Sequence, residues 1–503
     1  MAEREQDPAG GPLREDPGNG WLHAAADHRT GILLADPPRP SDSPLPDPRL
    51  PDAWTRDART RGSRVRDSRT SALGSAGPAG PPEPSARITR AVAAPERGAS
   101  TPGGYNPALD GIRALAVLAV LVFHMDSLPG GYLGVDVFFV LSGFLITGQL
   151  LAEWDRTGRV SLARFYLRRA FRLLPAFWLL ALVAFTAVVL LGIGTGGERS
   201  EFLRSLASSM LYLNNYFQVA DQSTGAGWLG HTWSLSLEEQ FYLLWPLLLI
   251  ALCRWPWLAR RLPVVLLGGV VMVALWRNVL MGLGASGTRA YFGLDTRADA
   301  LLVGCALAAW LRAARRGAAG EGRRALAWRR RLGRLALVVP VAGPVAFALL
   351  AVATVEAPDG WGPRATSMSR GGFTVVALLA GTVVLAVEVG VTKNWLSRAL
   401  SVRPLAWLGR ISYGFYLWHF PVVAHFGVDL ADDLGRWPAV LAVALISVAV
   451  ASASYYLLER PIQRRCPAWP RQRPFRATPS PRTPALAGSR RLEPWDSRVT
   501  GTG

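Results

Sequence analysis

The sequence is poor in the residues that hold metals and form disulfides. Its 503 residues include only three cysteines and six histidines. Cys253, Cys305 and Cys466 stand too far apart for a metal or disulfide motif, so we interpret them as isolated structural thiols. The histidines never fall four residues apart with a glutamate between them, which is the spacing of helical zinc sites. We therefore expect no bound metal.

Motifs of nucleotide-binding and hydrolytic enzymes are also missing. The chain has neither a Gly-x-x-x-x-Gly-Lys phosphate loop nor a Gly-x-Ser-x-Gly turn around a nucleophilic serine. Lysine occurs once, at Lys393, so arginine supplies nearly all the positive charge behind the net charge of +19. The excess lies in short loops between apolar blocks and in the C-terminal tail, which is typical of charge that sets membrane topology. We expect no nucleic-acid partner and no bound cofactor.

Long apolar runs are what the sequence has in abundance. Half of the residues are hydrophobic, and about 18 apolar residues in a row are enough for a helix that crosses a membrane. We therefore predict an all-α polytopic membrane protein with about ten transmembrane helices. The predicted spans are 109–126, 133–152, 173–194, 240–253, 262–281, 295–311, 335–355, 371–390, 411–428 and 438–457.

Basic residues divide unequally between the two sets of loops that these spans define. One set holds 22 of them, and the other holds six, or seven with Arg297 at the start of a predicted span. The positive-inside rule places the richer set, and with it both termini, in the cytoplasm. The richer loops are 156–172, 254–261, 312–334 and 393–410.

The two ends of the chain have a different composition from its middle. Residues 1–104 and 465–503 are rich in proline, glycine, arginine and serine and have few apolar runs. Such segments cannot bury enough apolar surface to fold, so we predict a disordered N-terminal tail and a disordered basic C-terminal tail. The membrane domain then covers residues 105–464.

Glu201–Phe217 does not fit the pattern of a span. Its apolar residues recur at helical spacing on one face, but the segment is short, and counting it as a span would move the arginine-rich loops outside. We predict an amphipathic helix that lies in the outer membrane interface.

The first predicted span carries ionisable residues that lipid does not tolerate. Arg113 and His124 lie about 16 Å apart along such a helix, and with Asp110 they fall within about 60° around its axis. This stripe must face other helices or a water-filled cavity. Ionisable residues inside a span are usually functional, and a buried structural network is the alternative.

Other polar residues stand out near the ends of later spans. Arg168, Arg169 and Arg172 lie at the predicted cytoplasmic surface, where the Arg169-x-x-Arg172 spacing suits phosphates, although a topology signal is the plain alternative. Ser236 is expected to cap the helix that carries Glu238 and Glu239. Further candidates, either on the acceptor side or structural, are Asp136, Ser142, Asp295, Arg297 and His419.

A series of motifs resembles the membrane-bound acyltransferase family 3, the group of O-antigen and macrolide O-acyltransferases. The motifs occur in family order over about residues 105–465. They are "LDGIRALAVLAVLVFH", "GVDVFFVLSGFLIT", "FYLRRAFRLLPA", "WSLSLEEQFYLLWP", "DTRADALLVG", "ISYGFYLWHFP" and "LERPI".

The resemblance implies a multi-pass enzyme of the bacterial plasma membrane that transfers an acyl group, commonly acetyl from acetyl-CoA, to a sugar hydroxyl. It identifies His124 and Glu238 as the catalytic residues, and it identifies Arg113 and the Arg169/Arg172 pair as family arginines. One subgroup carries a fused C-terminal esterase-like domain with a Gly-Asp-Ser motif. That motif is missing from this sequence, so we expect the chain to belong with the unfused members.

Physical reasoning agrees with this implication. Arg113, Arg168, Arg169 and Arg172 can offer charge-assisted bonds to the phosphates of an acyl-CoA co-substrate. His124 can act as a general base on the acceptor hydroxyl or can accept the acyl group itself. We expect the acceptor to be an envelope glycan or, as second choice, a glycosylated metabolite. The alternative function is a multi-span transporter or exporter, although the paired half-repeats typical of transporters are missing from the sequence.

Overall fold

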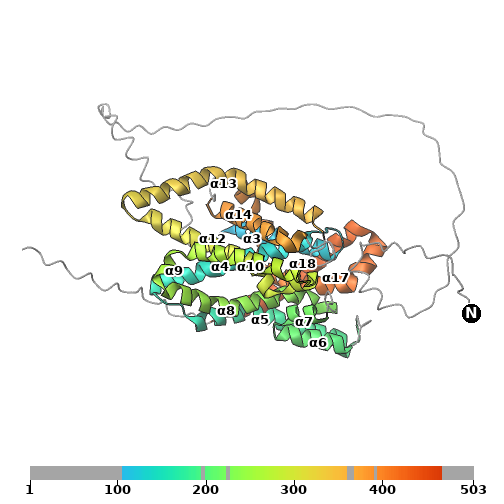
Figure 1. Cartoon of the computed structure of the whole chain (residues 1–503). Helices are drawn as coiled ribbons and strands as arrows, with labels where there is room; N and C mark the ends of the chain where they lie inside the picture. Colours follow the sequence, from blue (N-terminus) through green and yellow to red (C-terminus); the bar gives the residue numbers. More distant parts are fainter. Residues whose placement is uncertain (1–104, 194–198, 222–226, 359–366, 390–393, 467–503) are drawn as a thin grey trace, which may run out of the picture. The chain divides into compact units, whose positions relative to one another are not determined.

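The computed structural model of the protein describes residues 105–193, 199–221, 227–358, 367–389 and 394–466. Within these ranges every regular element is a helix (Figure 1). The tails predicted for residues 1–104 and 465–503 lie outside the described residues, apart from Arg465 and Cys466.

Eight helical segments of the described chain are long and apolar enough to cross a membrane. They match eight of the predicted spans in place and confirm an all-α, multi-pass membrane protein. They are Pro107–His124 (α3), Gly131–Thr157 (η1 and α4), Leu162–Leu190 (α5 and η2), Trp228–Arg254 (within η3, and α8), Leu262–Gly282 (α10), Gly322–Glu356 (α13), Met368–Val389 (η5 and α14) and Arg436–Arg464 (α18, η6 and α19).

The other two predicted spans coincide with α12 (Leu294–Ala319) and α17 (Ser412–Leu434). These helices have 26 and 23 residues, so at about 1.5 Å per residue each is long enough to cross a bilayer. Neither is among the eight apolar segments. Both bury polar side chains among neighbouring helices, which is where a membrane protein can carry such residues.

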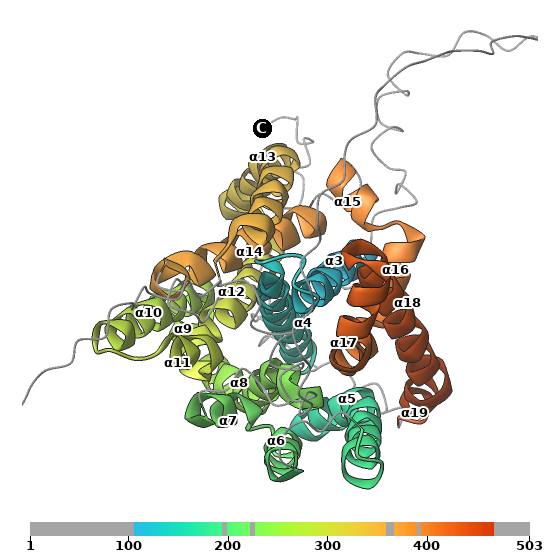
Figure 2. The same cartoon turned by 90° about the vertical axis from the view of Figure 1, so that its right-hand side faces the viewer.

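Helices α3 and α4 occupy the middle of the bundle, and Figure 2 shows α5, α8, α12, α14 and α17 around them. Burial follows the same order. The most apolar window of α3 is 61% buried and that of α4 is 67% buried, against 22% for α10 and 17% for α13. Residues on α3 and α4 are therefore shielded from lipid, whereas α10 and α13 expose the apolar side chains that lipid requires.

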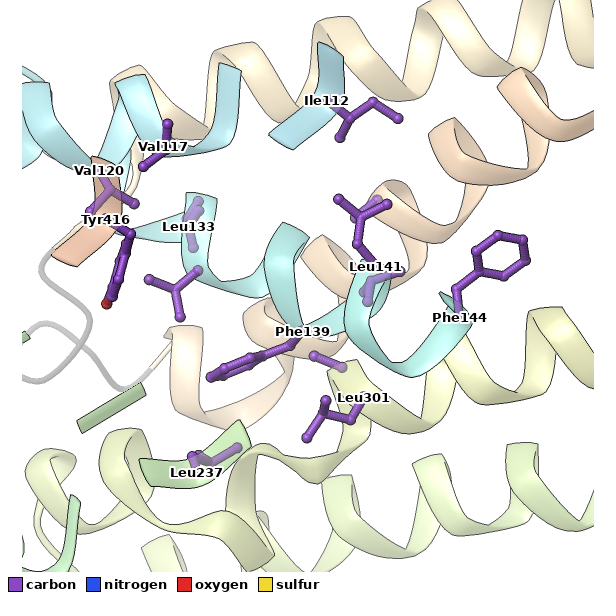
Figure 3. Packing of buried hydrophobic residues seen from close by; sticks show 14 of the residues in the cluster. Ile112, Val117, Val120, Leu133, Phe139, Leu141, Phe144, Leu237, Leu301 and Tyr416 are labelled. Carbon is purple, nitrogen blue, oxygen red and sulfur yellow. The ribbon is translucent and has the colours of Figure 1, made fainter. Parts of the chain in front are cut away.

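Helices α4 and α12 pack with their backbones in direct contact. A Cβ atom added to Gly143 would lie 2.0 Å from the carbonyl oxygen of Leu301, and one added to Gly304 would lie 2.0 Å from that of Val140. Glycine is therefore required on both sides of this crossing. Figure 3 shows part of the surrounding core, with Leu301 near Leu141 of α4.

Short helices connect the long ones. They include α6 (Arg199–Met210), α7 (Asn214–Asp221), α9 (Pro256–Arg260), α11 (Gly287–Phe292), α15 (Trp395–Leu400) and α16 (Arg403–Arg410). The single amphipathic helix predicted over 201–217 is wrong in one respect, because the chain breaks at Tyr212, where φ is +55°. On α6 the buried residues are Phe202, Ser205 and Ser209, while Leu203 and Met210 are exposed, so the helix presents apolar side chains both to the protein and away from it.

Candidate functional site

Helix α3 ends at His124. The side chain of Asn106 accepts a hydrogen bond from the Ala108 amide and caps the start of the helix. At the other end the chain turns at Asp126, where φ is +48°, and continues into η1 and α4. His124 therefore stands on the last turn of the central helix, with 8% of its surface exposed.

His124 contacts a second histidine that comes from α17. The Nε2 atom of His419 lies 3.2 Å from the Nδ1 atom of His124. The Nδ1 atom of His419 lies 2.7 Å from the carbonyl oxygen of Tyr416. The sequence placed His419 only among acceptor-side or structural residues, whereas the structure brings it directly onto His124.

The partners of His419 determine which nitrogen carries each proton. The Tyr416 carbonyl can only accept, so in a neutral His419 the proton is on Nδ1 and the lone pair is on Nε2. His124 then donates from its Nδ1 to that lone pair. This leaves the lone pair of His124 on Nε2, which is the form that a general base or a nucleophile needs.

A third histidine, His231, lies at the same end of the bundle. It belongs to η3 (Gly227–Thr232), is 2% exposed, and its ring centre is 5.5 Å from that of His419. His124 and His231 both line a small cavity whose other walls are mainly aromatic. The remaining lining residues are Val120, Phe123, Tyr132, Val135, Gly230, Trp233, Tyr291, Phe292, Tyr416 and Phe420.

Sequence reasoning missed His231 as a site residue. It directly precedes the motif that carries Glu238, in "GHTWSLSLEEQ". That position was the available signal, because an ionisable residue beside a family motif at the end of a span is itself a candidate for function. Ser236 was expected to cap this helix, but α8 (Trp233–Arg254) begins three residues earlier, and the Ser236 hydroxyl donates to the Thr232 carbonyl.

A second polar cluster surrounds Glu238, about one and a half turns into α8. The hydroxyl of Ser142 on α4 donates to the Glu238 carboxylate at 2.7 Å. The guanidinium of Arg169 lies 3.3 Å from the ring centre of Tyr242 and 4.0 Å from the carboxylate of Glu239. The charges of Arg169 and Arg113 also act on Glu238. The structure thus brings together residues of α3, α4, α5 and α8.

The three arginines of α5 (Leu162–Phe185) differ in their surroundings. Arg169 turns into the protein, where 19% of its side chain is exposed. Arg168 and Arg172 are exposed. The predicted span began at residue 173, but α5 starts at Leu162, so all three arginines stand on the helix and not in the loop before it.

Phe138 of α4 lies between the two polar clusters. The guanidinium of Arg113 is 6.0 Å from the centre of its ring, and the ring of Tyr416, which lines the histidine cavity, is 6.3 Å away. On α3, the residues between Arg113 and His124 include the buried Val117, Val120 and Leu121. On α3 and α4, apolar side chains therefore lie between the arginine cluster and the histidine cavity, whereas on α8 the buried hydroxyl of Ser234, one turn before Glu238, contacts Tyr416.

Asp110, the third member of the predicted stripe on α3, has a local partner. It accepts a hydrogen bond from the Tyr105 hydroxyl at 2.6 Å. Partial burial and this bond raise the pKa of Tyr105, which lies before the membrane span. Asp110 thus belongs to the end of α3 that is opposite to His124.

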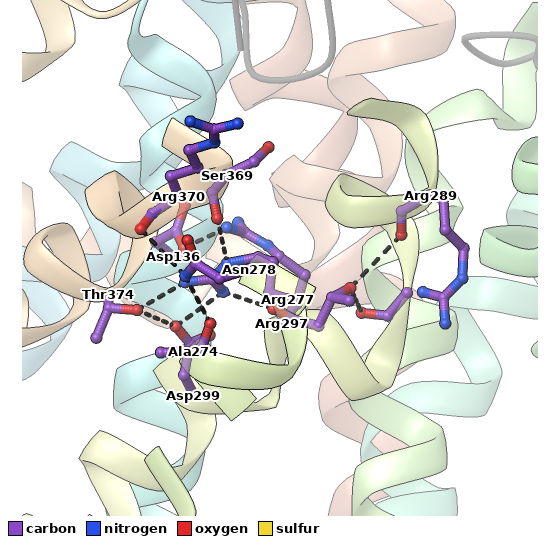
Figure 4. Close-up of polar contacts among 12 residues, drawn as sticks. Asp136, Ala274, Arg277, Asn278, Arg289, Arg297, Asp299, Ser369, Arg370 and Thr374 are labelled. Atoms are coloured by element: carbon purple, nitrogen blue, oxygen red, sulfur yellow. Dashed lines mark hydrogen bonds and ion pairs between the residues drawn. The ribbon is translucent and has the colours of Figure 1, made fainter. Parts of the chain in front are cut away.

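Buried ion pairs hold the helices behind the cavity. Asp136 of α4 pairs with Arg297 of α12 at 2.8 Å, and neither side chain is exposed. Arg277 of α10 pairs with Asp299 at 2.9 Å and also donates to the carbonyls of Ser369 and Thr296 and to the hydroxyl of Thr374 (Figure 4). These contacts favour a structural role for Asp136 and Arg297, and Arg277 is a buried partner that sequence reasoning missed.

Asp295, at the start of α12, lies nearer the surface. It accepts hydrogen bonds from Arg289 at 2.6 Å and from the indole of Trp276 at 2.7 Å. These bonds tie α11 and α10 to the first turn of α12. Among the described residues, no group of three or more histidine, cysteine, aspartate or glutamate side chains could hold a metal ion.

The fold and the site together define a multi-pass membrane protein with a buried histidine cavity near one end of its central helix and an arginine cluster toward the other. Residues 106–456 match the family described as an acyltransferase domain. The chain belongs to this acyltransferase family. No solved structure matches it.

The curated relatives that the chain matches are named as O-acetyltransferases, one of them as putative. The chain is 33% identical over 378 residues to the peptidoglycan O-acetyltransferase OatA of Listeria monocytogenes, with 72% of this chain and 56% of that protein covered. It is 34% identical over 372 residues to the putative peptidoglycan O-acetyltransferase YrhL of Bacillus subtilis, with 71% and 55% covered. It is 30% identical over 381 residues to the O-acetyltransferase OatA of Staphylococcus aureus, with 72% and 58% covered. The chain thus spans a little over half the length of these relatives.

Proposed function

We propose that the protein is an O-acyltransferase of the bacterial plasma membrane. It moves an acyl group, acetyl as the first choice, from cytoplasmic acyl-CoA to a hydroxyl group of an envelope glycan, with the amino-sugar strands of peptidoglycan as the first acceptor to test. The observation that carries the proposal is the hydrogen-bonded chain from Tyr416 through His419 to His124, in a cavity at one end of the central helix. The names of the relatives support the acceptor class.

In this mechanism His124 is the general base. Its Nε2 atom takes the proton from the acceptor hydroxyl while the oxygen attacks the acyl carbonyl carbon. The carbon–sulfur bond of the thioester then breaks, and the proton passes from His124 to the departing thiolate. His419 positions His124 and stabilises the imidazolium that forms, as the third member of a hydrolase triad does.

The arginine cluster serves the donor. Arg113 and Arg169 stand deep enough in the bundle to bind phosphates that enter from the cytoplasm, and the more exposed Arg168 and Arg172 attract them. Glu238, through its hydrogen bond to Ser142 and its place beside Arg169, limits the net positive charge and keeps these side chains in position. The slender acyl arm then reaches past Phe138 to the histidine cavity.

A sidedness experiment in sealed vesicles tests the proposal. In inside-out vesicles, labelled acetyl-CoA in the bath should acetylate a short chito-oligosaccharide trapped inside, because donor and acceptor sites lie at opposite ends of α3. Right-side-out vesicles should need the donor inside. His124→Ala should abolish the product while the protein still inserts and accumulates.

Two results would contradict the proposal. Movement of unmodified oligosaccharide without any acetylated product would support a transporter instead. Acetylation that requires donor and acceptor on the same side of the membrane would refute transfer through the bundle.

A further inference from the structure

We propose that His231 is the acceptor-binding residue of the histidine cavity, and that its imidazole holds a hydroxyl group of the sugar. This inference rests on the proposed function, because it concerns the acceptor of that same reaction. It assigns a role to a side chain that the family motifs and the general-base mechanism both leave without one.

The first observation is an unused hydrogen-bonding capacity. His231 is 2% exposed, and within the described part of the chain neither ring nitrogen makes a hydrogen bond of normal geometry, although the backbone of Leu417 is close enough to interact with the ring. A neutral imidazole carries one donor and one acceptor, and at least one of these groups is left unsatisfied in a buried position, which destabilises the empty site. His231 lies at the wall of a cavity, where a bound ligand can supply the missing hydrogen bond.

The second observation is that the ring of His231 is held in place. It stacks on Phe420 with ring centres 4.9 Å apart and an angle of 29° between the planes. The backbone carbonyl of His231 accepts a hydrogen bond from the Tyr416 hydroxyl at 3.0 Å. A side chain that is fixed by its neighbours but lacks a polar partner is pre-organised for a ligand.

The chemistry of the missing partner follows from the imidazole nitrogens and the walls around them. One hydroxyl group can donate to the unprotonated nitrogen or accept from the protonated one, and a second hydroxyl of the same sugar can serve the other nitrogen. The walls include the aromatic rings of Trp233, Tyr291 and Tyr132, which suit the C–H faces of a sugar ring. Mostly apolar walls with a few fixed polar groups are typical of small-molecule sites.

The position of His231 relative to His124 gives it a binding role and not a proton-transfer role. Both rings contact Phe420, with centres 4.8 Å and 4.9 Å away, so they flank the same aromatic side chain at the cavity wall. His124 is the histidine that His419 orients through a hydrogen bond. His231 therefore presents the acceptor on the side of the cavity that His124 lines, and the reacting proton goes to His124.

The test separates acceptor binding from chemistry. The full-length protein in nanodiscs is assayed for transfer from acetyl-CoA to a short chito-oligosaccharide and, without acceptor, for slow hydrolysis of acetyl-CoA by water. His231→Ala should raise the acceptor KM by about tenfold for each hydrogen bond lost, with hydrolysis unchanged. His231→Gln should recover part of the affinity because its amide also donates and accepts. His425→Ala, a half-buried histidine of α17 outside the cavity lining, is the matched control.

Direct binding keeps the inference testable apart from the reaction. Titration of the same oligosaccharide into the protein without donor should show about tenfold weaker binding for each hydrogen bond lost in His231→Ala, and an affinity between that of His231→Ala and the wild type for His231→Gln. Equal affinities, or a parallel loss of hydrolysis and transfer, would overturn the role of His231. A wild-type protein that binds the sugar but never turns over acetyl-CoA would instead overturn the proposed function and leave the binding role standing.

Discussion

Replacement of His419 by alanine gives the most direct test of the histidine pair. In the ground state the bond between His124 Nδ1 and His419 Nε2 joins two neutral rings 3.2 Å apart, and such bonds contribute about 0.5–1.5 kcal/mol. In the transition state of the proposed mechanism His124 becomes an imidazolium, and a hydrogen bond from a charged group is worth about 1.5–3 kcal/mol. The variant lacks both bonds, so kcat should fall by the difference between them, about 1–1.5 kcal/mol.

We therefore expect His419→Ala to lower kcat by roughly 5- to 13-fold and to leave the KM for acetyl-CoA nearly unchanged. The assay is transfer of labelled acetyl to the oligosaccharide in nanodiscs, with both substrates varied. His124→Ala removes the base itself and should cost about 10²- to 10⁴-fold. His419→Ala combined with His124→Ala should be no worse than His124→Ala alone, because residues that act as a unit are not additive.

The reasoning fails if the two losses multiply, because His419 would then act independently of His124. It also fails if His419→Ala raises the donor KM without changing kcat, which would place His419 in binding. Thermal unfolding of each variant in detergent serves as the control for folding, since His419 is fully buried.

Two further predictions concern charge. Arg169→Ala should weaken acyl-CoA binding by roughly 10- to 150-fold, because a charge-assisted contact is worth about 1.5–3 kcal/mol. Arg168→Ala, on the exposed side of α5, should change this affinity by less than about twofold. Equal effects of the two variants in a binding titration would mean that the arginines act only through their total charge. Asp136→Asn leaves Arg297 buried without its counter-charge and should destabilise the protein by about 3–5 kcal/mol, measured as a lower unfolding temperature. Asp155 of α4 pairs with Arg312 and Arg316 of α12, and its side chain is 20% exposed. Asp155→Asn should therefore cost only about 1 kcal/mol, and a similar loss for both variants would contradict the role assigned to burial.

The membrane-spanning helices could be predicted from the length of the apolar runs. This signal is clearest for helices whose surfaces face lipid. Segments such as α10 and α13 are apolar because their surfaces face the bilayer. Helix α12 was found despite its charges, but its polarity has a meaning that only the structure shows, because Arg297 and Asp299 are paired with residues of other helices.

The site was predictable only in part. His124 could be found because a histidine in a long apolar run is unusual, and the family motifs point to it. Arg277 could not be paired with Asp299 from periodicity, because a contact between two helices depends on their rotation and crossing. The same limit applies to Glu238, which was grouped with His124 in sequence reasoning but hydrogen-bonds Ser142 in the structure. Its catalytic role stays a prediction.

The apolar stretch around Phe138, between the arginine cluster and the histidine cavity, has a consequence for the energy supply of the cell. A continuous polar path along α3 would conduct protons, and each proton that leaks across 100 mV dissipates about 2.3 kcal/mol. Phe138 and the buried valines of α3 interrupt such a path with side chains that cannot hydrate an ion. In the proposed mechanism a neutral acetyl group passes this barrier, whereas the charged phosphates of acyl-CoA do not. If that mechanism holds, the same few side chains admit the acetyl group, exclude the phosphates and limit proton leakage across the membrane.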